Sequence, residues 1–363
     1  MWVKRGFMPN KEVILITGCS GRIGFKAAER FAPDYEIAGF DLILAGHLPD
    51  VDFIIVDMAS DESMKAGLEK VRKEYGNKIA SVIHLAAYYS FTQAHSSNYD
   101  RITVQGTERL LRGLKDFEVE QFIFSSTMLV HAPTKPGVKI TEDSPVVPKW
   151  AYPESKVKTE KVIKELHGNI PYVIMRIAGV YDDQCHSIPI SNQIQRIFEN
   201  QLESHLFAGD LTHGASFIHM DDLIEALWLA VQKRKTLPKE LTLLIGEEST
   251  LSYDDLQKEI AALIYGGASW KTFSVPKFIA KIGAWIQDHL PFMKESFIKP
   301  WMIDIADDHY ELDTTRAKKV LGWAPKHNVK DTLPIMIGEL KADPRTWYDE
   351  NKLHFSSKIL MHK

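Results

Sequence analysis

Cysteine is scarce in this chain of 363 residues, which contains only Cys19 and Cys185. Two cysteines cannot form a disulfide framework, and neither has partners at the spacing that a metal site requires. The histidines show no HExxH or comparable metal-binding pattern either. The composition therefore argues against a disulfide-stabilised protein, predicts no metal ligands, and agrees with a reducing, cytoplasmic location.

The chain also lacks long apolar runs and an excess of either charge. No apolar run approaches the roughly 20 residues that span a bilayer. The N-terminal sequence MWVKRGFMPNKEV has neither the apolar core nor the cleavage site of a secretory signal. With 44 basic and 48 acidic residues the net charge is −4, which predicts no nucleic-acid surface and no polybasic membrane patch. We expect a small-molecule substrate, no nucleic-acid partner and no integral membrane segment.

Apolar, β-rich segments alternate with helical patterns through the first half of the chain. Strands are predicted for VILITG (13–18), EIAGFD (36–41), VDFIIVDM (51–58), SVIHLAA (81–87), EQFIFSST (120–127) and PYVIMRIAGVY (171–181). Apolar residues three or four apart predict helices at 22–32, 61–75, 98–117 and 152–168. Near-continuous apolar strands between helices are typical of a parallel sheet covered on both faces. We therefore predict an α/β fold with a doubly wound parallel sheet of the Rossmann type.

The alternation ends after Tyr181, where longer and less regular segments begin. LTLLIG (241–246) predicts one more strand, and helical patterns follow at 252–264, 276–289 and 330–342. We expect two lobes and a tail. They are a dinucleotide-binding domain at 11–182, to which 211–246 returns, a mostly helical substrate lobe made of 183–210 and 247–345, and an uninterpreted tail at 346–363.

A glycine-rich loop, TGCSGRIG, follows the first predicted strand and opens into the first predicted helix. Gly18, Gly21 and Gly24 permit a tight turn and a close approach of the backbone to a pyrophosphate, whose charge would lie at the positive end of the helix. Asp41 ends the second strand, 23 residues after Gly18. Its carboxylate can accept hydrogen bonds from both ribose hydroxyls and would repel a 2′-phosphate. The predicted cofactor is therefore NAD in preference to NADP.

Neighbouring residues complete the predicted cofactor site. They are Ser20, Arg22, Ile23, Asp57, Met58, Leu85, Ala86, Ala87 and Ser125. Asp57 is suited equally to contacting the adenine and to forming a turn. The alternative for the whole pattern is a strand, turn and helix with packing glycines and a surface aspartate at position 41.

WAYPESKVKTEK (150–161) sets Tyr152 and Lys156 four residues apart at the start of a predicted helix. Residues at this spacing share a helix face, and Pro153 is compatible with the first turn. A phenol with a pKa near 10 is a poor base at neutral pH, but a neighbouring ammonium and a cationic nicotinamide would lower that pKa. Tyr152 could then exchange a proton with a substrate hydroxyl, while Lys156 could also bind the nicotinamide ribose.

Hydroxyl side chains end the fifth predicted strand, in FSST. Ser125, Ser126 and Thr127 are candidates to hold the reacting oxygen, because ligands of open α/β sheets bind at the carboxyl ends of the strands. Tyr88 and Arg176 follow or end other strands, and together with Ser126 they are the predicted substrate contacts. For Arg176 a structural ion pair is an equal alternative.

These motifs, in this order, resemble the extended short-chain dehydrogenase/reductase superfamily, in its NAD-dependent epimerase/dehydratase group. TGCSGRIG is similar to the TGxxGxxG of that group, HLAA (84–87) to its cofactor-lining strand end, FSST to its hydroxyl strand and YPESK to its YxxxK. Three later segments also resemble the group, so that the likeness runs from about residue 12 to 340. They are RIAGVYD (176–182), FIHMDDLIEAL (217–227) and LDTTRAKKVLGWAP (312–325).

The resemblance implies an NAD-dependent oxidoreductase or epimerase that acts on a secondary alcohol. By position Tyr152 matches the general acid/base, Lys156 its helper, and Thr127 the residue that holds the substrate oxygen. The resemblance also implies a homodimer formed by the helices at 98–117 and 152–168.

The chain departs from the group at three places. Met128 and Leu129 stand where sugar 4,6-dehydratases carry an Asp-Glu pair for proton transfer. Ala215 or Ser216 stands where nucleotide-sugar enzymes usually have an arginine for the diphosphate. The residues at 130–132, Val-His-Ala, replace Val-Tyr-Gly. These differences argue against a dehydratase and weaken the case for a UDP-sugar substrate.

The segment at 273–301 is rich in Phe, Trp, Ile and Met at helical spacing. A core face that closes on the sheet explains this pattern best. The alternative is an apolar pocket or membrane-surface contact, as in hydroxysteroid dehydrogenase-like relatives, which leaves a 3β-hydroxysteroid dehydrogenase-like enzyme as an alternative function. A non-catalytic NAD-binding regulator is a further alternative.

Four polar residues are assigned structural positions. His84 is expected beneath the cofactor, His219 just before a helix, and the pair Asp221 and Asp222 at the cap of that helix.

Overall fold

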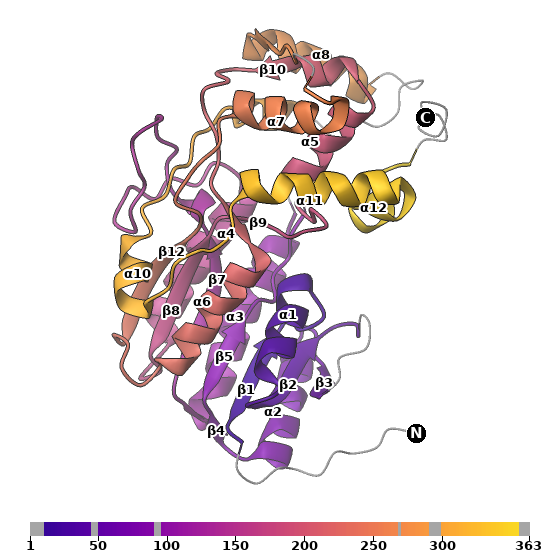
Figure 1. Ribbon diagram of the computed structural model, residues 1–363. Helices are drawn as coiled ribbons and strands as arrows, with labels where there is room; N and C mark the ends of the chain where they lie inside the picture. Colours follow the sequence, from indigo (N-terminus) through magenta and orange to yellow (C-terminus); the bar gives the residue numbers. More distant parts are fainter. Residues whose placement is uncertain (1–10, 45–49, 91–95, 268–269, 290–298, 356–363) are drawn as a thin grey trace.

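A seven-stranded parallel sheet forms the centre of the molecule, in the strand order β12-β8-β7-β5-β1-β2-β3 (Figure 1). The computed structural model describes residues 11–44, 50–90, 96–267, 270–289 and 299–355. In chain order the strands are β1 (Val13–Thr17), β2 (Glu36–Asp41), β3 (Val51–Ile55), β5 (Ser81–His84), β7 (Phe122–Thr127), β8 (Tyr172–Ile177) and β12 (Glu240–Ile245). The chain builds outward from β1 to one edge and then returns to build the other edge, which confirms the doubly wound fold.

Helices cover both faces of the sheet. One core packs α1 (Arg22–Phe31), α6 (Met220–Gln232) and α10 (Thr315–Leu321) against the sheet, and the other packs α2 (Asp61–Tyr75), α3 (Gln105–Gly113) and α4 (Ala151–Leu166). All five residues of β1 and all six of β8 are buried. Burial on both faces explains why these strands have continuous apolar sequences instead of alternating ones.

The predicted strand at 171–181 is in fact two strands. After β8, Ala178 intervenes and β9 (Gly179–Tyr181) pairs with β11 (Phe217–His219) in a separate small sheet. A continuous apolar run cannot reveal such a change of partner, because the apolar residues continue without a break from β8 into β9. The predicted helix at 98–117 is also composite, since a π-helix (Tyr99–Val104) precedes α3 and a 3₁₀ turn (Leu114–Asp116) follows it. A short strand pair, β4 (Lys78–Ile79) and β6 (Glu118–Val119), lies beside the main sheet.

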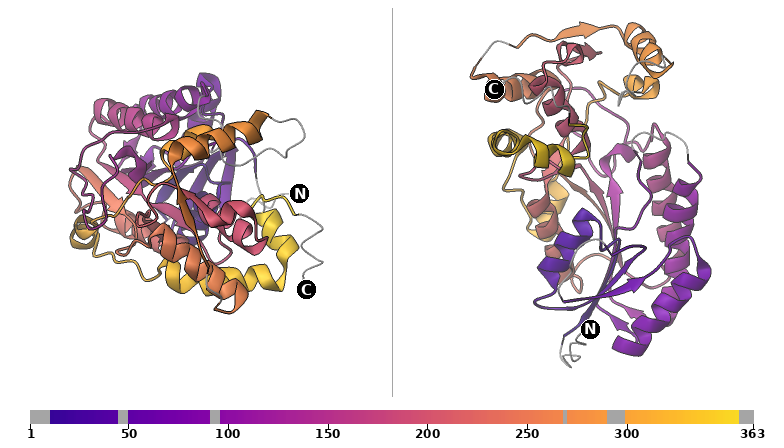
Figure 2. Two further views of the ribbon diagram at one scale, coloured as in Figure 1. Left: turned by 90° about the horizontal axis from the view of Figure 1, so that it is seen from above. Right: turned by 90° about the vertical axis from the view of Figure 1, so that its right-hand side faces the viewer.

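A smaller, mostly helical lobe stands beyond the carboxyl ends of the strands (Figures 1 and 2). One of its cores joins α5 (Ile188–Phe198), α7 (Tyr253–Tyr265), α11 (Val329–Ala342) and α12 (Pro344–Glu350). A second, smaller group contains β10 (Leu206–Ala208), β13 (Phe273–Val275), α8 (Lys277–His289) and α9 (Pro300–Asp304). The helices predicted at 252–264, 276–289 and 330–342 are present with ends shifted by one residue or none.

Part of the uninterpreted tail belongs to this lobe. Helix α12 begins at Pro344 and buries Trp347 and Tyr348. The guanidinium of Arg22, in the first turn of α1, donates a hydrogen bond of 2.7 Å to the carbonyl of Glu350. This contact ties the end of the chain to the start of the glycine-loop helix. In the ranges that the structure describes, no helix has both the length and the apolar character needed to cross a bilayer.

Candidate active site

The glycine loop folds tightly between β1 and α1. Gly18 has φ +73°, and a Cβ atom at this position would lie 2.8 Å from the backbone nitrogen of Ala86. A Cβ at Gly24 would lie 2.1 Å from the carbonyl oxygen of Gly18. Only glycine fits at both places. The first turn of α1 contains no acidic residue, and its N-terminal N–H groups give the site an anion-binding character that suits a pyrophosphate.

Asp41 closes this cradle from the end of β2. Its Oδ2 accepts a hydrogen bond from the backbone N–H of Ser20 at 2.9 Å, and its Oδ1 accepts one from Leu42 at 2.7 Å. The carboxylate is therefore held beside the glycine loop. Asp57 behaves differently, because its Oδ1 accepts a hydrogen bond of 2.8 Å from the N–H of Ala59. Of the two roles that the sequence allowed for Asp57, this hydrogen bond is the turn-forming one.

The other predicted cofactor contacts surround the loop. Leu85 and Ala86 donate backbone hydrogen bonds to Thr17, at 3.1 and 3.2 Å. The imidazole of His84 is fully buried between the hydroxyls of Thr17 and Thr107, at 2.6 and 2.8 Å. Burial, together with the charge of Lys156, lowers the pKa of His84 to about 3, so this ring is neutral. Ile23 and Met58 pack into the two sheet cores, and Ala87 follows Ala86 at the same strand end.

The predicted catalytic residues meet at the carboxyl edge of the sheet. Thr127 is the last residue of β7, while Tyr152 and Lys156 lie on the first two turns of α4. Lys156 is buried, and its Nζ donates a 2.7 Å hydrogen bond to the carbonyl of Ser125. The same Nζ lies 5.8 Å from the centroid of the Tyr152 ring. Ser125 in turn donates a 3.3 Å hydrogen bond to the carbonyl of His84. Residues of three sequence motifs thus converge at the carboxyl ends of β5 and β7.

The environment of Tyr152 differs from the expectation in one respect. Burial raises the pKa of this phenol to about 12, although a hydrogen bond with Thr127 acts in the opposite direction. The ammonium of Lys156 alone does not lower this pKa, because it is directed to the carbonyl of Ser125 and does not offset the desolvation of the phenol.

The comparison with known proteins agrees with this geometry. The family model described as the NAD dependent epimerase/dehydratase family matches residues 14–246. The chain belongs to this family. Membership confirms the resemblance, and with it an NAD-dependent enzyme.

Individual relatives of this epimerase/dehydratase family member cover nearly its whole length. The UDP-glucose 4-epimerase of Lactobacillus helveticus is 24% identical over 361 residues, which cover 93% of this chain and 99% of that protein. The crystal structure of the UDP-glucose 4-epimerase of Thermotoga maritima has a TM-score of 0.68 at 19% identity and covers 92% of this chain and 100% of that one. The structure of UDP-glucuronic acid 4-epimerase from Bacillus cereus, in complex with UDP-glucuronic acid and NAD, has a TM-score of 0.67 at 20% identity, with 91% and 99% covered.

The pKa of the Lys156 ammonium is strongly altered in this epimerase/dehydratase site. Burial lowers its pKa from 10.5 to about 7, while the carboxylate of Glu160 acts to raise it. Between pH 7 and pH 10.5 the folded state binds fewer protons than the unfolded state, so stability rises with pH in this range. Burial of Lys156 therefore destabilises the fold most at pH 7 and below, and this cost falls as the pH approaches 10.5.

Replacing Lys156 with methionine is therefore expected to stabilise the protein at neutral pH. We expect a higher urea midpoint for Lys156→Met than for the wild type at pH 7, and a difference that shrinks by pH 10. Unfolding curves of both proteins at several pH values would measure it. Lys161→Met, which changes an exposed lysine of the same helix, should show no such trend. A Lys156→Met variant that is less stable at pH 7 would contradict the burial argument.

A buried polar network lies behind Lys156. Glu160 accepts two hydrogen bonds from the guanidinium of Arg176, at 3.1 and 2.7 Å, and one from the hydroxyl of Ser126 at 2.6 Å. Arg176 also donates to Nε2 of His131 at 3.1 Å and to the carbonyl of Glu142 at 2.9 Å. The predictions that Ser126 and Arg176 contact substrate are therefore corrected: both side chains are buried and directed into this network. For Arg176, the ion-pair alternative is the one that holds.

Aromatic side chains surround Tyr152. The ring of Tyr89 lies 4.8 Å from it and that of Trp150 lies 5.3 Å away, measured between centroids. Trp150 also packs against Trp301 of α9 at 5.2 Å. The predicted substrate residue Tyr88 packs against Tyr99 at 4.9 Å. Sequence reasoning missed Tyr89, Trp150 and Trp301. Tyr89 and Trp150 could have been found from the sequence, because they stand next to the HLAA and YPESK motifs. Trp301 could not, because only the packing of the second lobe brings it to Trp150.

The structure shows the surroundings of the residues that depart from the epimerase/dehydratase pattern. Met128 is buried and Leu129 is partly buried in a 3₁₀ turn after Thr127, so no carboxylate stands there. Ser216 is fully buried, and its backbone N–H bonds to the carbonyl of Tyr310. His131 accepts a hydrogen bond from Arg176, and burial lowers its pKa to about 4. The His131 side chain that replaces the usual tyrosine is therefore neutral and buried beside Arg176.

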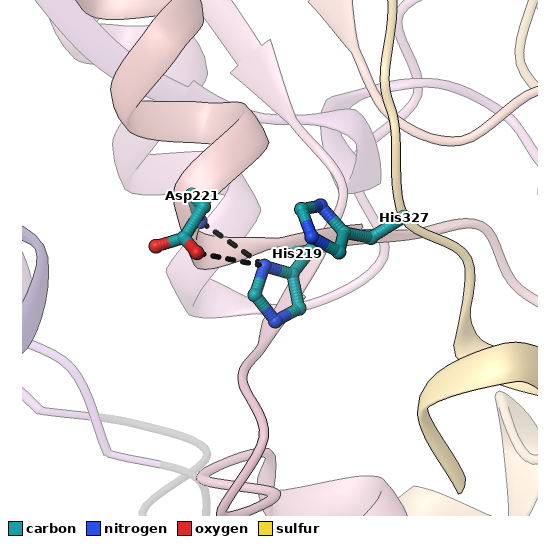
Figure 3. Close-up of side chains that lie close together, drawn as sticks. All are labelled: His219, Asp221 and His327. Carbon is teal, nitrogen blue, oxygen red and sulfur yellow. Dashed lines mark hydrogen bonds and ion pairs between the residues drawn. The ribbon is translucent and has the colours of Figure 1, made fainter. Parts of the chain in front are cut away.

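His219, Asp221 and His327 lie close together at the start of α6 (Figure 3). Nδ1 of His219 accepts a hydrogen bond from the N–H of Asp221 at 3.2 Å, so His219 caps the helix itself. The rings of His219 and His327 stack with centroids 4.2 Å apart and an angle of 25°. Imidazole lone pairs lie in the ring plane, so two nearly parallel rings do not converge on one ion. We therefore assign this cluster a structural role.

The expectation that Asp221 and Asp222 cap α6 is wrong, because the side chain of His219 caps this helix. Asp222 is buried, and its Oδ2 accepts hydrogen bonds from the backbone N–H groups of Lys326 and His327, both at 2.9 Å. It connects α6 to the segment before α11. His219 does precede the helix, as expected.

Proposed function

We propose that this protein catalyses NAD-dependent hydride transfer at a secondary alcohol, as an oxidoreductase or an epimerase. The observation that carries the proposal is the meeting of Thr127, Tyr152 and Lys156 at the carboxyl end of β7. In this proposal Tyr152 is the general acid/base, Thr127 holds the reacting oxygen and Lys156 binds the nicotinamide ribose.

The glycine cradle and Asp41 suit NAD, because the loop leaves no space for a Cβ and offers helix N–H groups to a pyrophosphate. NAD supplies the hydride acceptor, and its cationic ring also favours the phenolate of Tyr152. That contribution matters because burial alone keeps the phenol protonated at neutral pH. Thr127 donates to or accepts from the substrate hydroxyl, and Tyr152 takes the proton that the alcohol loses. Lys156 is within one helical turn of Tyr152 and is assigned to the nicotinamide ribose.

Asp41 is expected to set the preference between the two nicotinamide cofactors. In Asp41→Asn the negative charge that repels a 2′-phosphate is lost, whereas an oxygen that accepts backbone hydrogen bonds remains. We expect the ratio of NAD to NADP affinity to fall about 10-fold, since hydrogen bonds to a charged group contribute about 1.5–3 kcal/mol. Calorimetric titration with each cofactor would measure the ratio. Asp34→Asn, an exposed aspartate in the turn after α1, is the control. An unchanged ratio in Asp41→Asn would exclude this role.

Two classes of substrate compete for the site. The named relatives act on UDP-sugars, which supports a nucleotide-linked sugar. The second candidate is a 3β-hydroxysteroid dehydrogenase-like reaction on a lipophilic alcohol. It is supported by the aromatic side chains around Tyr152 and by Ala215 and Ser216 at the position of the usual diphosphate-binding arginine.

Turnover assays would decide between these substrates. The protein is incubated with NAD and either UDP-glucose, UDP-glucuronic acid or a panel of steroid alcohols, and absorbance at 340 nm is followed while sugar products are separated by chromatography. A new sugar epimer without net NADH identifies an epimerase. NADH formed from a lipophilic alcohol identifies a dehydrogenase. Binding of NAD with no reaction on either panel would contradict the proposed chemistry and favour a regulator.

We also propose the organisation that accompanies this function: a cytoplasmic homodimer, an NAD-binding domain of 11–182 with 211–246, and a substrate lobe of 183–210 and 247–345. The outer faces of α3 and α4 carry charges of both signs, including the exposed Glu154 and the ion pairs Arg112–Glu108 and Lys158–Asp100 within the chain, and a mixed-charge surface of this kind suits a two-fold interface. Light scattering after size-exclusion chromatography would measure the mass. A monomer at all concentrations would exclude the dimer.

A further inference from the structure

The buried imidazole of His84 has a partner on each ring nitrogen, and the hydroxyl protons determine the direction of both hydrogen bonds. Thr107, on α3, donates its single hydroxyl proton to the carbonyl of Thr103 at 2.6 Å. Its oxygen therefore accepts from Nε2 of His84, at 2.8 Å. A neutral ring carries one N–H, so Nδ1 is an acceptor and the hydroxyl of Thr17 donates to it, at 2.6 Å. The ring is consequently the Nε2–H tautomer.

The hydrogen bonds of His84 continue in both directions and end on one segment. Thr17, the last residue of β1, accepts from the backbone N–H of Ala86 at 3.2 Å. The hydroxyl of Thr103, in the π-helix that precedes α3, accepts from the N–H of Tyr88 at 2.9 Å. The side chains that connect these two amides are all fully buried, and we call them the His84 network: Thr17, His84, Thr103 and Thr107. The network joins β1 to the π-helix behind the segment that follows β5.

This segment leads to the proposed acid/base. Beyond its two anchored amides, the carbonyl of Ser90 accepts a 2.9 Å hydrogen bond from the hydroxyl of Tyr99, in the same π-helix. Tyr89 lies between the last two anchors, and its ring meets that of Tyr152 edge-on, with centroids 4.8 Å apart. Anchors on alternate residues thus fix the backbone on both sides of Tyr89. A π-helix at this place is consistent with a functional site.

The same segment also borders the cofactor loop and the proposed catalytic lysine. Strand β5 lies between β1 and β7 in the sheet (Figure 1). A Cβ atom at Gly18 would lie 2.8 Å from the backbone nitrogen of Ala86. The carbonyl of His84 accepts from the hydroxyl of Ser125, whose own carbonyl binds Lys156. The position of this segment therefore affects the glycine loop at one end and the reaction centre at the other.

We propose that His84 is a positioning residue, whose hydrogen-bond network holds Tyr89 against Tyr152 in the geometry that the reaction requires. The role rests on the proposed function, because it serves the reaction at Tyr152. It needs a neutral ring and no proton transfer at the imidazole, since an imidazolium would donate at both nitrogens and lose the hydrogen bond from Thr17. Burial and the charge of Lys156, which lower the pKa of His84 to about 3, keep the ring in this form.

Two substitutions of Thr107 separate the His84 network from the packing of α3. Valine keeps the shape of the side chain but removes the hydroxyl, so the buried N–H of His84 loses its acceptor and the ring or the π-helix has to move. We expect kcat for hydride transfer to fall about 10–100-fold in Thr107→Val, since small displacements around a reaction centre have effects of this size. Affinity for NAD should be that of the wild type. Thr107→Ser keeps the hydroxyl and should restore most of the rate.

Thr332→Val is the matched control. Its hydroxyl is also buried, and it donates a 3.0 Å hydrogen bond to the carbonyl of Asn328, four residues earlier, as Thr107 does to Thr103. Thr332 lies on α11, in the second lobe, and its loss of the hydroxyl should leave kcat unchanged.

Hydrogen exchange at the backbone amide of Tyr88, followed by NMR, gives a measurement that needs no substrate. We expect exchange about 10-fold faster in Thr107→Val, the effect of losing about one hydrogen bond. Exchange should stay at the wild-type rate in Thr107→Ser and Thr332→Val.

Three outcomes would overturn the positioning role. Unchanged exchange at Tyr88 in Thr107→Val would show that the network does not hold this segment. Faster exchange with a wild-type kcat would leave the network a part of the fold alone, and equal losses of kcat in Thr107→Val and Thr332→Val would indicate general destabilisation. A wild type that turns over no alcohol, with exchange that still responds to Thr107→Val, would remove the proposed function and leave the anchoring of the segment in place.

Discussion

Replacing Tyr152 with phenylalanine is expected to lower kcat by about 10²–10⁴-fold, the usual contribution of a general acid/base. The change removes one oxygen atom and leaves the ring among Tyr89, Trp150 and the first turn of α4. Affinity for NAD should change little, because the glycine loop and Asp41 make no contact through this hydroxyl. The measurement is single-turnover hydride transfer with the substrate that the assays identify, together with a calorimetric titration of NAD.

Tyr265→Phe provides the matched control for this experiment. Tyr265 lies at the end of α7, and its hydroxyl donates a 2.6 Å hydrogen bond to the carbonyl of Ile197, within the second lobe. Removal of the Tyr265 hydroxyl should leave hydride transfer at the wild-type rate. Full activity in Tyr152→Phe would exclude the phenol as the acid/base. Equal loss in both variants would point to general destabilisation instead of a catalytic defect.

The fold was largely predictable because its strands are buried on both faces. Continuous apolar runs such as that of β1, bounded by a glycine loop, leave few alternatives to a parallel sheet. The same apolar continuity hid the break at Ala178, since β8 and β9 change partner within one uninterrupted apolar run. Helix α5 lies in the region where the sequence alternation ends, and it was not predicted at all. Its core partners, α7 and α11, come from much later in the chain.

The candidate site was predictable where the motif itself sets the geometry. Spacing along one helix brought Tyr152 and Lys156 together, and the end of β7 supplied Thr127. The side of the sheet to which each hydroxyl side chain of β7 points was not predicted. Ser125, Ser126 and Thr127 are consecutive, yet alternate residues of a strand face opposite sides of the sheet, and Ser126 consequently joins Glu160 in the interior. Trp301 could not be found, because only the packing of α9 on Trp150 brings it near Tyr152.

The protonation of the site depends on contacts that no motif records. Tyr152 and Lys156 are both desolvated, and burial raises the pKa of the phenol while it lowers the pKa of the ammonium. Each shift favours the neutral form of its group. Added positive charge near the phenol and added negative charge near the ammonium would favour the ionised forms that the proposed mechanism uses. Glu160 supplies the second from within the chain.

Replacing Arg176 with methionine is expected to have the largest effect on stability. The guanidinium is 4% exposed and makes two hydrogen bonds to the carboxylate of Glu160, which is also 4% exposed. Without Arg176 this carboxylate keeps the hydroxyl of Ser126 but loses its counter-ion. Removing one partner of a buried ion pair typically costs about 3–5 kcal/mol, because the other charge stays buried. The urea midpoint at pH 7 should fall accordingly, with Arg112→Met, an exposed arginine of α3, as the control.

The double variant Arg176→Met, Glu160→Met separates the ion pair from the role of Glu160 beside Lys156. Replacing both charges with apolar side chains of similar size should restore most of the lost stability, since no unpaired charge remains buried. The pKa of Lys156 should then fall below its value of about 7, because Glu160 is the group that raises it. Activity that depends on the ammonium would consequently decline at a lower pH in the double variant than in the wild type. Recovered stability with an unchanged pH profile would assign Glu160 to the fold alone, whereas a double variant as unstable as Arg176→Met would show that the polar network itself specifies the packing of α4 against β7 and β8.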